Sequence, residues 1–322
     1  PNDWAIRCNL VTVENEEMRD FTAGHITSEE GAPLIQAIGQ RLGGSLPADL
    51  MPGFKGRLKF HPGVSYRNIL VYRADDKSPF TAETKTQPPH DIPDRPIAGH
   101  LPQGPGSQLL QKLMALSCDI LRDHPVNVAR RQSGKRPATQ IWLWGQGPAP
   151  SLRSFAEVYG KHGAIISAVD LVRGVGVLLG WKRIDVPGAT GYLDTDYAAK
   201  GRHGIAALKD HDLVCVHVEA PDEASHEGKA DAKVKALEEI DRHIVGPLLG
   251  ALKEFGNWRI LVSPDHRTPL RTRAHAHGAV PFAMAGTGIP SLGQMSYDES
   301  VAASAAKAYD PGCRLMRDFL SV

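Results

Sequence analysis

The sequence lacks the features that mark several large classes of protein. No run approaches the roughly 18 consecutive apolar residues of a membrane-spanning helix. Its 37 basic and 36 acidic side chains leave a net charge of +1, so no overall field attracts nucleic acid or a membrane surface. The four cysteines lie far apart and form no CxxC pair, which indicates reduced thiols. We therefore expect a cytoplasmic protein that binds neither nucleic acid nor membrane.

The length, the hydrophobic content and the order of expected strands and helices predict a soluble α/β protein. With 322 residues, 42% of them hydrophobic, the chain can form one large domain or a core with a smaller partner domain. In residues 1–95 a strand is followed by a helix and two strands, which predicts a small α+β domain. In residues 96–322 short apolar strands alternate with amphipathic helices. This pattern predicts a mostly parallel sheet between layers of helices.

Polar side chains lie beside three of the expected strands of the second domain, where ligands bind in an open α/β sheet. Asp222 and His226 follow one strand, Asp265 and His266 follow the next, and His275 shortly precedes the last. Asp222 and His226 are four residues apart and share a face if a helix has begun. Carboxylate and imidazole together suit Mn²⁺, Fe²⁺ or Zn²⁺. A pair of such ions suits phosphoryl chemistry, because it can hold the attacking and the leaving oxygen.

Each of these features alone has a simpler interpretation. An Asp-x-x-x-His at a helix start is usually a cap with a solvated histidine, and Asp-His at a strand end is usually a turn. Their occurrence at three strand ends favours a metal site. By the same reasoning, Cys215 and His217 are interpreted as packing residues within a strand. The run from Arg130 to Arg136 is interpreted first as a solvated loop, although an arginine there could hold a phosphate.

Several motifs, in order along nearly the whole chain, resemble the blocks of one family. They include AIRCNLVTV, TAGHITSEE, PPHDIP, VPGATGYLDT, VHVEAPDEASHEG and SPDHRTP. The series resembles the cofactor-independent phosphoglycerate mutases of the archaeal-type branch and its bacterial relatives, in the alkaline phosphatase superfamily. The resemblance implies an alkaline-phosphatase-like core over residues 96–322. It also implies that residues 1–95 form the inserted domain that closes over the substrate.

The resemblance further implies the reaction and its site. Two divalent ions, expected to be Mn²⁺ with Zn²⁺, Mg²⁺ or Co²⁺ as alternatives, would flank a serine that carries the phosphoryl group between 3-phosphoglycerate and 2-phosphoglycerate. Asp222, His226 and His275 would hold one ion, and Asp265 and His266 would belong to the second. The small phosphorylated three-carbon acid would lie near the polar residues Arg7, Arg67, His90, Asp91 and Arg130.

One part of the family's pattern has no match in this sequence. The family carries a metal-binding aspartate in an Asp-Gly segment, and the nucleophilic serine, ahead of the block that matches AIRCNLVTV. Here that block follows Pro1-Asn2-Asp3-Trp4 directly, without an initiating methionine. We therefore expect the core to lack its N-terminal strand and this chain alone to be inactive. The absent segment, as a separate piece, is one expected partner.

Two other functions stay open from the sequence. One is a phosphohydrolase or phosphotransferase of the same superfamily that acts on another small phosphorylated or phosphonate substrate, because a fold does not determine a substrate. The other is a non-catalytic fragment that binds a metal. The oligomeric state is open as well.

Overall fold

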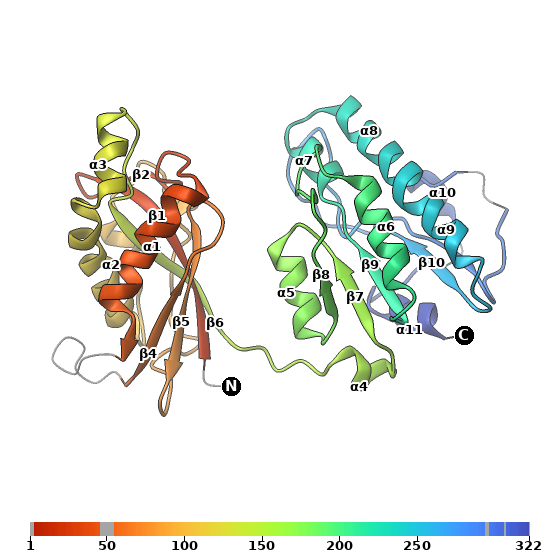
Figure 1. The fold of residues 1–322 in the computed structure, drawn as a ribbon, viewed down its shortest axis with the longest axis horizontal. Helices are drawn as coiled ribbons and strands as arrows, with labels where there is room; N and C mark the ends of the chain where they lie inside the picture. Colours follow the sequence, from red (N-terminus) through yellow and green to blue (C-terminus); the bar gives the residue numbers. More distant parts are fainter. Residues whose placement is uncertain (1–2, 46–54, 294–295, 306, 322) are drawn as a thin grey trace. The chain divides into compact units, whose positions relative to one another are not determined.

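The computed structural model describes residues 3–45, 55–293, 296–305 and 307–321, and the chain divides into two compact units. Unit 1 spans residues 1–151 and unit 2 spans residues 152–322 (Figure 1). No helix in these described ranges has the length and hydropathy needed to cross a lipid bilayer. Each unit combines helices with its own sheets, so the α/β class predicted from the sequence is confirmed.

Unit 1 is built on an antiparallel sheet with the strand order β2-β1-β5-β4-β3, in which β6 pairs with the other edge of β1. Helix α1 packs on β4 and helix α2 packs on β6. The strands are β1 (Asp3–Glu14), β2 (Glu17–Asp20), β3 (Gly44–Ser45), β4 (Gly56–His61), β5 (Arg67–Ala74) and β6 (Gln140–Pro148). The helices are α1 (Ser28–Leu42), α2 (Ser107–Arg122) and α3 (Pro125–Gln132), with short 3₁₀ turns at Pro89–Asp91 and Ala98–His100.

Local chemistry explains where helix α1 begins and ends. Thr27 accepts a hydrogen bond from the Glu30 N–H, and the Glu30 carboxylate accepts one from the Thr27 N–H. This capping box satisfies two N–H groups that the first turn would leave unpaired. The apolar side chains of Leu34, Ile35 and Ile38 lie on one stripe of the helix and are buried. The helix ends at Leu42, and Gly43 forms its C-cap.

The observed boundary between the units lies at residue 151, later than the predicted boundary at residue 95. The reason is the pairing of β6, which extends along β1 from the Trp4–Pro148 pair to the Val11–Gln140 pair. Helix α2 then covers β6, so residues 96–151 belong to the sheet of unit 1. Among the residues that the structure describes, one core of 26 buried hydrophobic residues contains side chains from β1, α1, β5, α2 and β6.

Unit 2 contains a three-stranded parallel sheet with the order β8-β7-β9 and an antiparallel pair, β10-β11. The parallel sheet confirms the predicted pattern, whereas the β10-β11 pair departs from it. The strands are β7 (Gly163–Ile166), β8 (Lys182–Ile184), β9 (Leu213–Val216), β10 (Arg259–Val262) and β11 (Ala283–Gly286). The helices are α4 (Phe155–Tyr159), α5 (Asp170–Leu178), α6 (Tyr197–Ala207), α7 (Ala220–His226), α8 (Ala230–Ile240), α9 (Gly246–Leu252), α10 (Glu299–Ser304) and α11 (Arg314–Leu320). A π-helical turn, Asp241–Val245, joins α8 to α9.

Candidate metal centre

Helix α7 carries the first two predicted ligands at the carboxyl end of β9. Asp222 lies in its first turn and His226 at its end, and His226 Nε2 lies 3.1 Å from Asp222 Oδ2. The four-residue spacing therefore brings both groups onto one face of the helix, as predicted. Both side chains are only partly exposed.

The loop that follows β10 brings a second histidine to the same place. His275 Nε2 lies 3.0 Å from His226 Nε2 and 3.5 Å from Asp222 Oδ1. His226 Nδ1 lies 2.9 Å from the carbonyl oxygen of Arg273, so Nδ1 carries the hydrogen and Nε2 presents a lone pair. A lone pair that faces a second imidazole nitrogen and a carboxylate is a donor set suited to a cation.

His266 joins this group through a different contact. Its ring centroid lies 4.0 Å from that of His275. Asp222, His266 and His275 each offer one ligand atom, and these atoms all lie within 4.8 Å of one another. The resemblance had assigned His266 with Asp265 to a second ion, whereas the geometry groups His266 with Asp222 and His275. These residues fit a metal ion on the chemistry and spacing of their donors.

Asp265 lies at the edge of this group. Its Oδ1 accepts a hydrogen bond of 2.9 Å from the His266 N–H, and its carboxylate is 64% exposed. It is therefore largely exposed to solvent, while its Oδ2 lies 3.5 Å from His266 Nε2. The assignment of Asp265 and His266 to a second ion stays a prediction.

The electrostatics of Asp222 match those of a metal ligand. Burial raises the pKa of its carboxyl group. The hydrogen bond from Thr268 and the facing His226 and His275 together lower this pKa by more than burial raises it, so the net shift is downward. The carboxylate is therefore ionised at neutral pH. Lys233 donates a hydrogen bond of 3.2 Å to the Thr268 carbonyl oxygen and so fixes the residue that orients Asp222.

A second polar group lies at the ends of β7 and β9 and includes His217, which was predicted to be a packing residue. His217 Nδ1 is 3.1 Å from Ser167 Oγ, and His217 Nε2 is 3.4 Å from a Glu219 carboxylate oxygen. Burial lowers the pKa of His217, and burial together with the carboxylates of Asp222 and Asp265 raises the pKa of Glu219. The alternation of His217 and Glu219 at the end of a strand was the signal that could have revealed this group.

Four of the predicted substrate residues are exposed on unit 1. The Arg7 guanidinium lies 4.6 Å from the centroid of Trp144, and the His90 ring lies 5.4 Å from that of Trp144. Arg67 stacks on Tyr66. Phe21 contacts both His90 and Tyr66, so a continuous series of rings links the two arginines. Asp91 is exposed next to His90.

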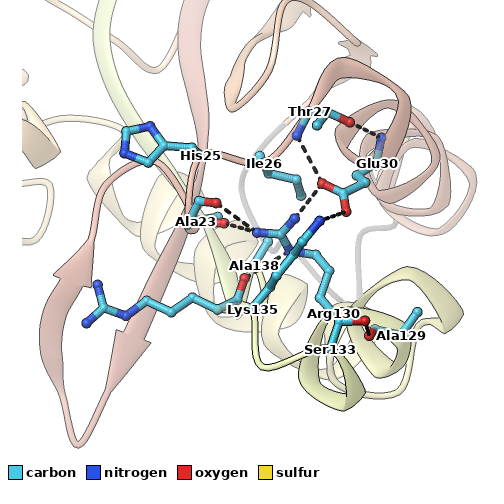
Figure 2. A network of polar contacts seen from close by, with 12 residues as sticks. Ala23, His25, Ile26, Thr27, Glu30, Ala129, Arg130, Ser133, Lys135 and Ala138 are labelled. Carbon is cyan, nitrogen blue, oxygen red and sulfur yellow. Dashed lines mark hydrogen bonds and ion pairs between the residues drawn. The ribbon is translucent and has the colours of Figure 1, made fainter.

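Arg130, the fifth predicted substrate residue, is buried instead (Figure 2). Its guanidinium donates hydrogen bonds to the carbonyl oxygens of Arg136, Ala23 and Gly24 and pairs with Glu30. Its side chain is 2% exposed. Arg130 thus binds other parts of unit 1, and its contact with substrate stays a prediction.

The fold is that of an α/β protein with a parallel sheet. The carboxylate and imidazole groups that follow its strands place the chain among α/β proteins with a candidate metal site. A family model described as 2,3-bisphosphoglycerate-independent phosphoglycerate mutase matches residues 1–127. The mutase of Methanothrix thermoacetophila is 46% identical over 97% of this chain and 75% of its own length. A probable mutase of Geobacter sulfurreducens is 44% identical over 99% of this chain and 77% of its own length. The chain belongs to the 2,3-bisphosphoglycerate-independent phosphoglycerate mutases.

Solved structures share the fold of this chain. The PH0037 protein of Pyrococcus horikoshii superposes with a TM-score of 0.67 at 26% identity and covers 89% of this chain and 65% of that chain. The cofactor-independent phosphoglycerate mutase of Thermoplasma acidophilum gives a TM-score of 0.62 at 24% identity and supports the fold, over 99% of this chain and 77% of that chain. The family resemblance and the assignment to the isomerases are therefore confirmed.

Proposed function

We propose that this chain supplies the metal-holding and substrate-holding parts of a cytoplasmic, glycolytic mutase that interconverts 3-phosphoglycerate and 2-phosphoglycerate through a phosphoserine. The observation that carries the proposal is the convergence of Asp222, His266 and His275 within 4.8 Å, in a chain 46% identical to a named mutase. His226 contacts two of these three residues and completes the group.

We assign the metal as Mn²⁺, with two ions in the active protein. When bound, the ions neutralise charge on the transferring phosphoryl group. The chain's own residues prepare the site. Thr268 orients the Asp222 carboxylate, and the Arg273 carbonyl oxygen selects the tautomer of His226. We assign Asp265, whose Oδ2 lies 3.5 Å from His266 Nε2, to the second ion together with His266.

For the glycerate, we assign Arg7, Arg67 and His90 of unit 1. All three are exposed, and the aromatic rings beneath them hold the side chains in place without neutralising their charge. An arginine held in this way can bind a carboxylate or phosphate with two parallel hydrogen bonds. Asp91 would limit the orientation of the His90 ring, because its Oδ1 lies 3.7 Å from His90 Nε2.

The experiment incubates the full-length protein with Mn²⁺ and 3-phosphoglycerate and follows the products by phosphorus NMR. We expect 2-phosphoglycerate to appear without release of inorganic phosphate. Release of inorganic phosphate without isomerised product would support the phosphohydrolase alternative. If no product forms while His275→Ala leaves metal binding unchanged, the proposal is wrong.

A further inference from the structure

The loop that joins β10 to β11 is held in one conformation by its own main chain. The Ala276 N–H donates to the Arg267 carbonyl oxygen (2.9 Å) and closes the base of the loop. Further along, the N–H groups of Thr272 and Arg273 both donate to the Pro269 carbonyl oxygen, at 3.1 and 2.9 Å. Arg273 ends this turn in the left-handed conformation, with a φ of 53°. A non-glycine residue adopts this conformation at a cost, which points to a role for Arg273.

The carbonyl oxygen of Arg273 contacts one of the predicted metal ligands. It accepts the hydrogen bond from His226 Nδ1 at 2.9 Å. The other nitrogen of the same ring, Nε2, lies 3.0 Å from His275 Nε2 and 3.1 Å from Asp222 Oδ2. A hydrogen bond at one nitrogen of an imidazole fixes both the tautomer and the direction of the other nitrogen. The conformation of Arg273 therefore governs how His226 faces the ligand group.

Helix α7 ends directly after His226 in a Schellman motif. The Gly228 N–H donates to the Ser225 carbonyl oxygen (3.0 Å), and the Lys229 N–H donates to the Ala224 carbonyl oxygen (2.9 Å). Gly228 has a φ of 72°, and glycine usually fills this left-handed position at the C-terminus of a helix. The motif therefore explains why the helix stops here and why a glycine follows it.

The side chain of Arg273 packs on the main chain of Gly228. A Cβ atom at Gly228 would lie 2.5 Å from Arg273 Nε and 2.7 Å from its Cζ and Nη2, closer than Cβ atoms come to their neighbours. The contact therefore depends on the absence of a side chain at residue 228. It joins the loop after β10 to the end of α7, and these two elements carry the histidines of the candidate metal centre.

We propose that Arg273 is a positioning residue for His226. Its packing on Gly228 stabilises the left-handed conformation that directs the Arg273 carbonyl oxygen to His226 Nδ1. Neither Arg273 nor Gly228 belongs to the group of ligand atoms, so the pair acts on metal binding through the orientation of one imidazole. The consequence for metal binding rests on the proposed function, whereas the tautomer of His226 is a property of the metal-free chain.

Arg271 is the matched control for Arg273. It lies in the same turn, it is exposed, and its φ is not positive. Arg271→Ala removes the same charge and the same length of side chain as Arg273→Ala. It leaves the left-handed residue and its carbonyl oxygen in place. Any effect of charge alone near the ligand group would therefore appear in both variants.

The first test measures the tautomer of His226 in the metal-free protein by long-range proton–nitrogen NMR correlation, at about pH 8.5, above the range in which imidazole titrates. We expect the hydrogen on Nδ1 in the original chain. Arg273→Ala should transfer part of the population to the form with the hydrogen on Nε2, because alanine keeps the cost of the left-handed conformation and loses the packing. Arg273→Gly should restore the original tautomer, because glycine adopts this conformation readily. Arg271→Ala should change nothing.

The second test measures the affinity for Mn²⁺ by isothermal titration calorimetry. We expect Arg273→Ala to lower this affinity at least about fivefold, and Arg273→Gly and Arg271→Ala to stay within about twofold of the original. Circular dichroism checks that each variant is folded. Equal losses in Arg273→Ala and Arg273→Gly would overturn the proposal, and so would an unchanged tautomer in Arg273→Ala. If the original chain bound no Mn²⁺, the proposed function would fail, and the tautomer alone would decide the role of Arg273.

A double-mutant cycle tests the packing of Arg273 on Gly228. Gly228→Ala should lower the affinity for Mn²⁺ at least about tenfold in the original chain, and by a clearly smaller factor, at most about threefold, in the Arg273→Gly background. The strain of a left-handed alanine at residue 228 is the same in both backgrounds and cancels in the cycle. Equal losses in the two backgrounds would refute the contact. If Gly228→Ala does not fold, the tautomers of Arg273→Ala and Arg273→Gly decide the proposal.

Discussion

The candidate metal centre depends on a few residues whose roles can be tested one at a time. Removal of the His275 imidazole removes a ligand atom and leaves His226 Nε2 without the partner that lies 3.0 Å away. We expect His275→Ala to lower the affinity for Mn²⁺ by at least about tenfold, since even residues behind the ligands cost 10–100-fold. Isothermal titration calorimetry measures this affinity in the chain as it stands.

His277 provides the matched control for that variant. It lies two residues away in the same exposed loop, and the group of ligand atoms does not include it. His277→Ala should leave the affinity for Mn²⁺ within about twofold of the original, because it removes no ligand and little buried surface. Equal losses in the two variants would contradict the assignment of His275 as a ligand.

A buried lysine leads to an expectation about pH. Lys200 is fully buried, and its ammonium has two long contacts, to the carbonyl oxygens of Thr190 (3.5 Å) and His217 (3.4 Å). Burial, and then the nearby Arg173, lower its pKa from 10.5 to about 8. Below pH 8 the amine is charged in both the folded and the unfolded chain, so folding pays the full desolvation cost. Between pH 8 and 10.5 the unfolded chain binds more protons, so this group makes stability rise with pH.

Substitution of Lys200 removes that cost. We expect Lys200→Met to raise the free energy of unfolding by about 1–3 kcal/mol at pH 7, because it replaces a buried charge without a close counter-ion. The gain should shrink as pH rises from 8 to 10.5. Urea unfolding at several pH values measures it, with the exposed Lys209→Met as a control that should stay within about 0.5 kcal/mol. If the stability gained by Lys200→Met grew as the pH rose from 8 to 10.5, the predicted direction of the pKa shift of Lys200 would be wrong.

At the scale of elements, Arg130 of α3 fastens the turn that leads into α1. Ala23, Gly24 and His25 have positive φ angles of 50°, 66° and 49°, a conformation that non-glycine residues adopt at a cost. Arg130 holds this turn by donating to the carbonyl oxygens of Ala23 and Gly24, while it pairs with Glu30 of α1. Figure 2 shows the His25 side chain directed away from this network.

Loss of this guanidinium should therefore destabilise unit 1. We expect Arg130→Ala to lower the free energy of unfolding by about 3–5 kcal/mol, because it removes the buried partner of Glu30 and the donor to the carbonyl oxygens of Ala23, Gly24 and Arg136. Arg131→Ala is the control, since the neighbouring Arg131 is exposed and donates a single hydrogen bond to the Arg122 carbonyl oxygen. That variant should lose less than about 1 kcal/mol in the same urea titration. Similar losses of unfolding free energy in the two variants would show that the buried contacts of Arg130 stabilise unit 1 no more than those of an exposed arginine.

The elements also show what the sequence could and could not predict. The start of α1 at Thr27 and the shared face of Asp222 and His226 were predictable, because both depend on residues within one helical turn. The pairing of β6 with β1 was not, because it joins Val11 to Gln140 and nothing local in either strand encodes the partner. The inclusion of His266 in the ligand group depends in the same way on the path of the loop after β10.

At the scale of the whole molecule, the two units should unfold separately and with different stabilities. Each has its own buried clusters, but unit 1 has the far larger hydrophobic core, and buried apolar surface is the main favourable contribution to folding. We expect two transitions in urea, with unit 2 unfolding first. Peptide-resolved hydrogen exchange during the titration identifies the unit that opens in each transition.

Metal then offers a selective test of that order, because the ligand group lies entirely in unit 2. An ion that binds only the folded unit stabilises it by RT ln(1 + [L]/Kd), which is about 2.7 kcal/mol at a hundredfold excess over Kd. Mn²⁺ should therefore move the first transition to higher urea and leave the second unchanged, and EDTA should reverse the shift. In His275→Ala the first transition should no longer respond. If Mn²⁺ moved the transition of unit 1 instead, the metal centre would lie outside the group formed by Asp222, His266 and His275.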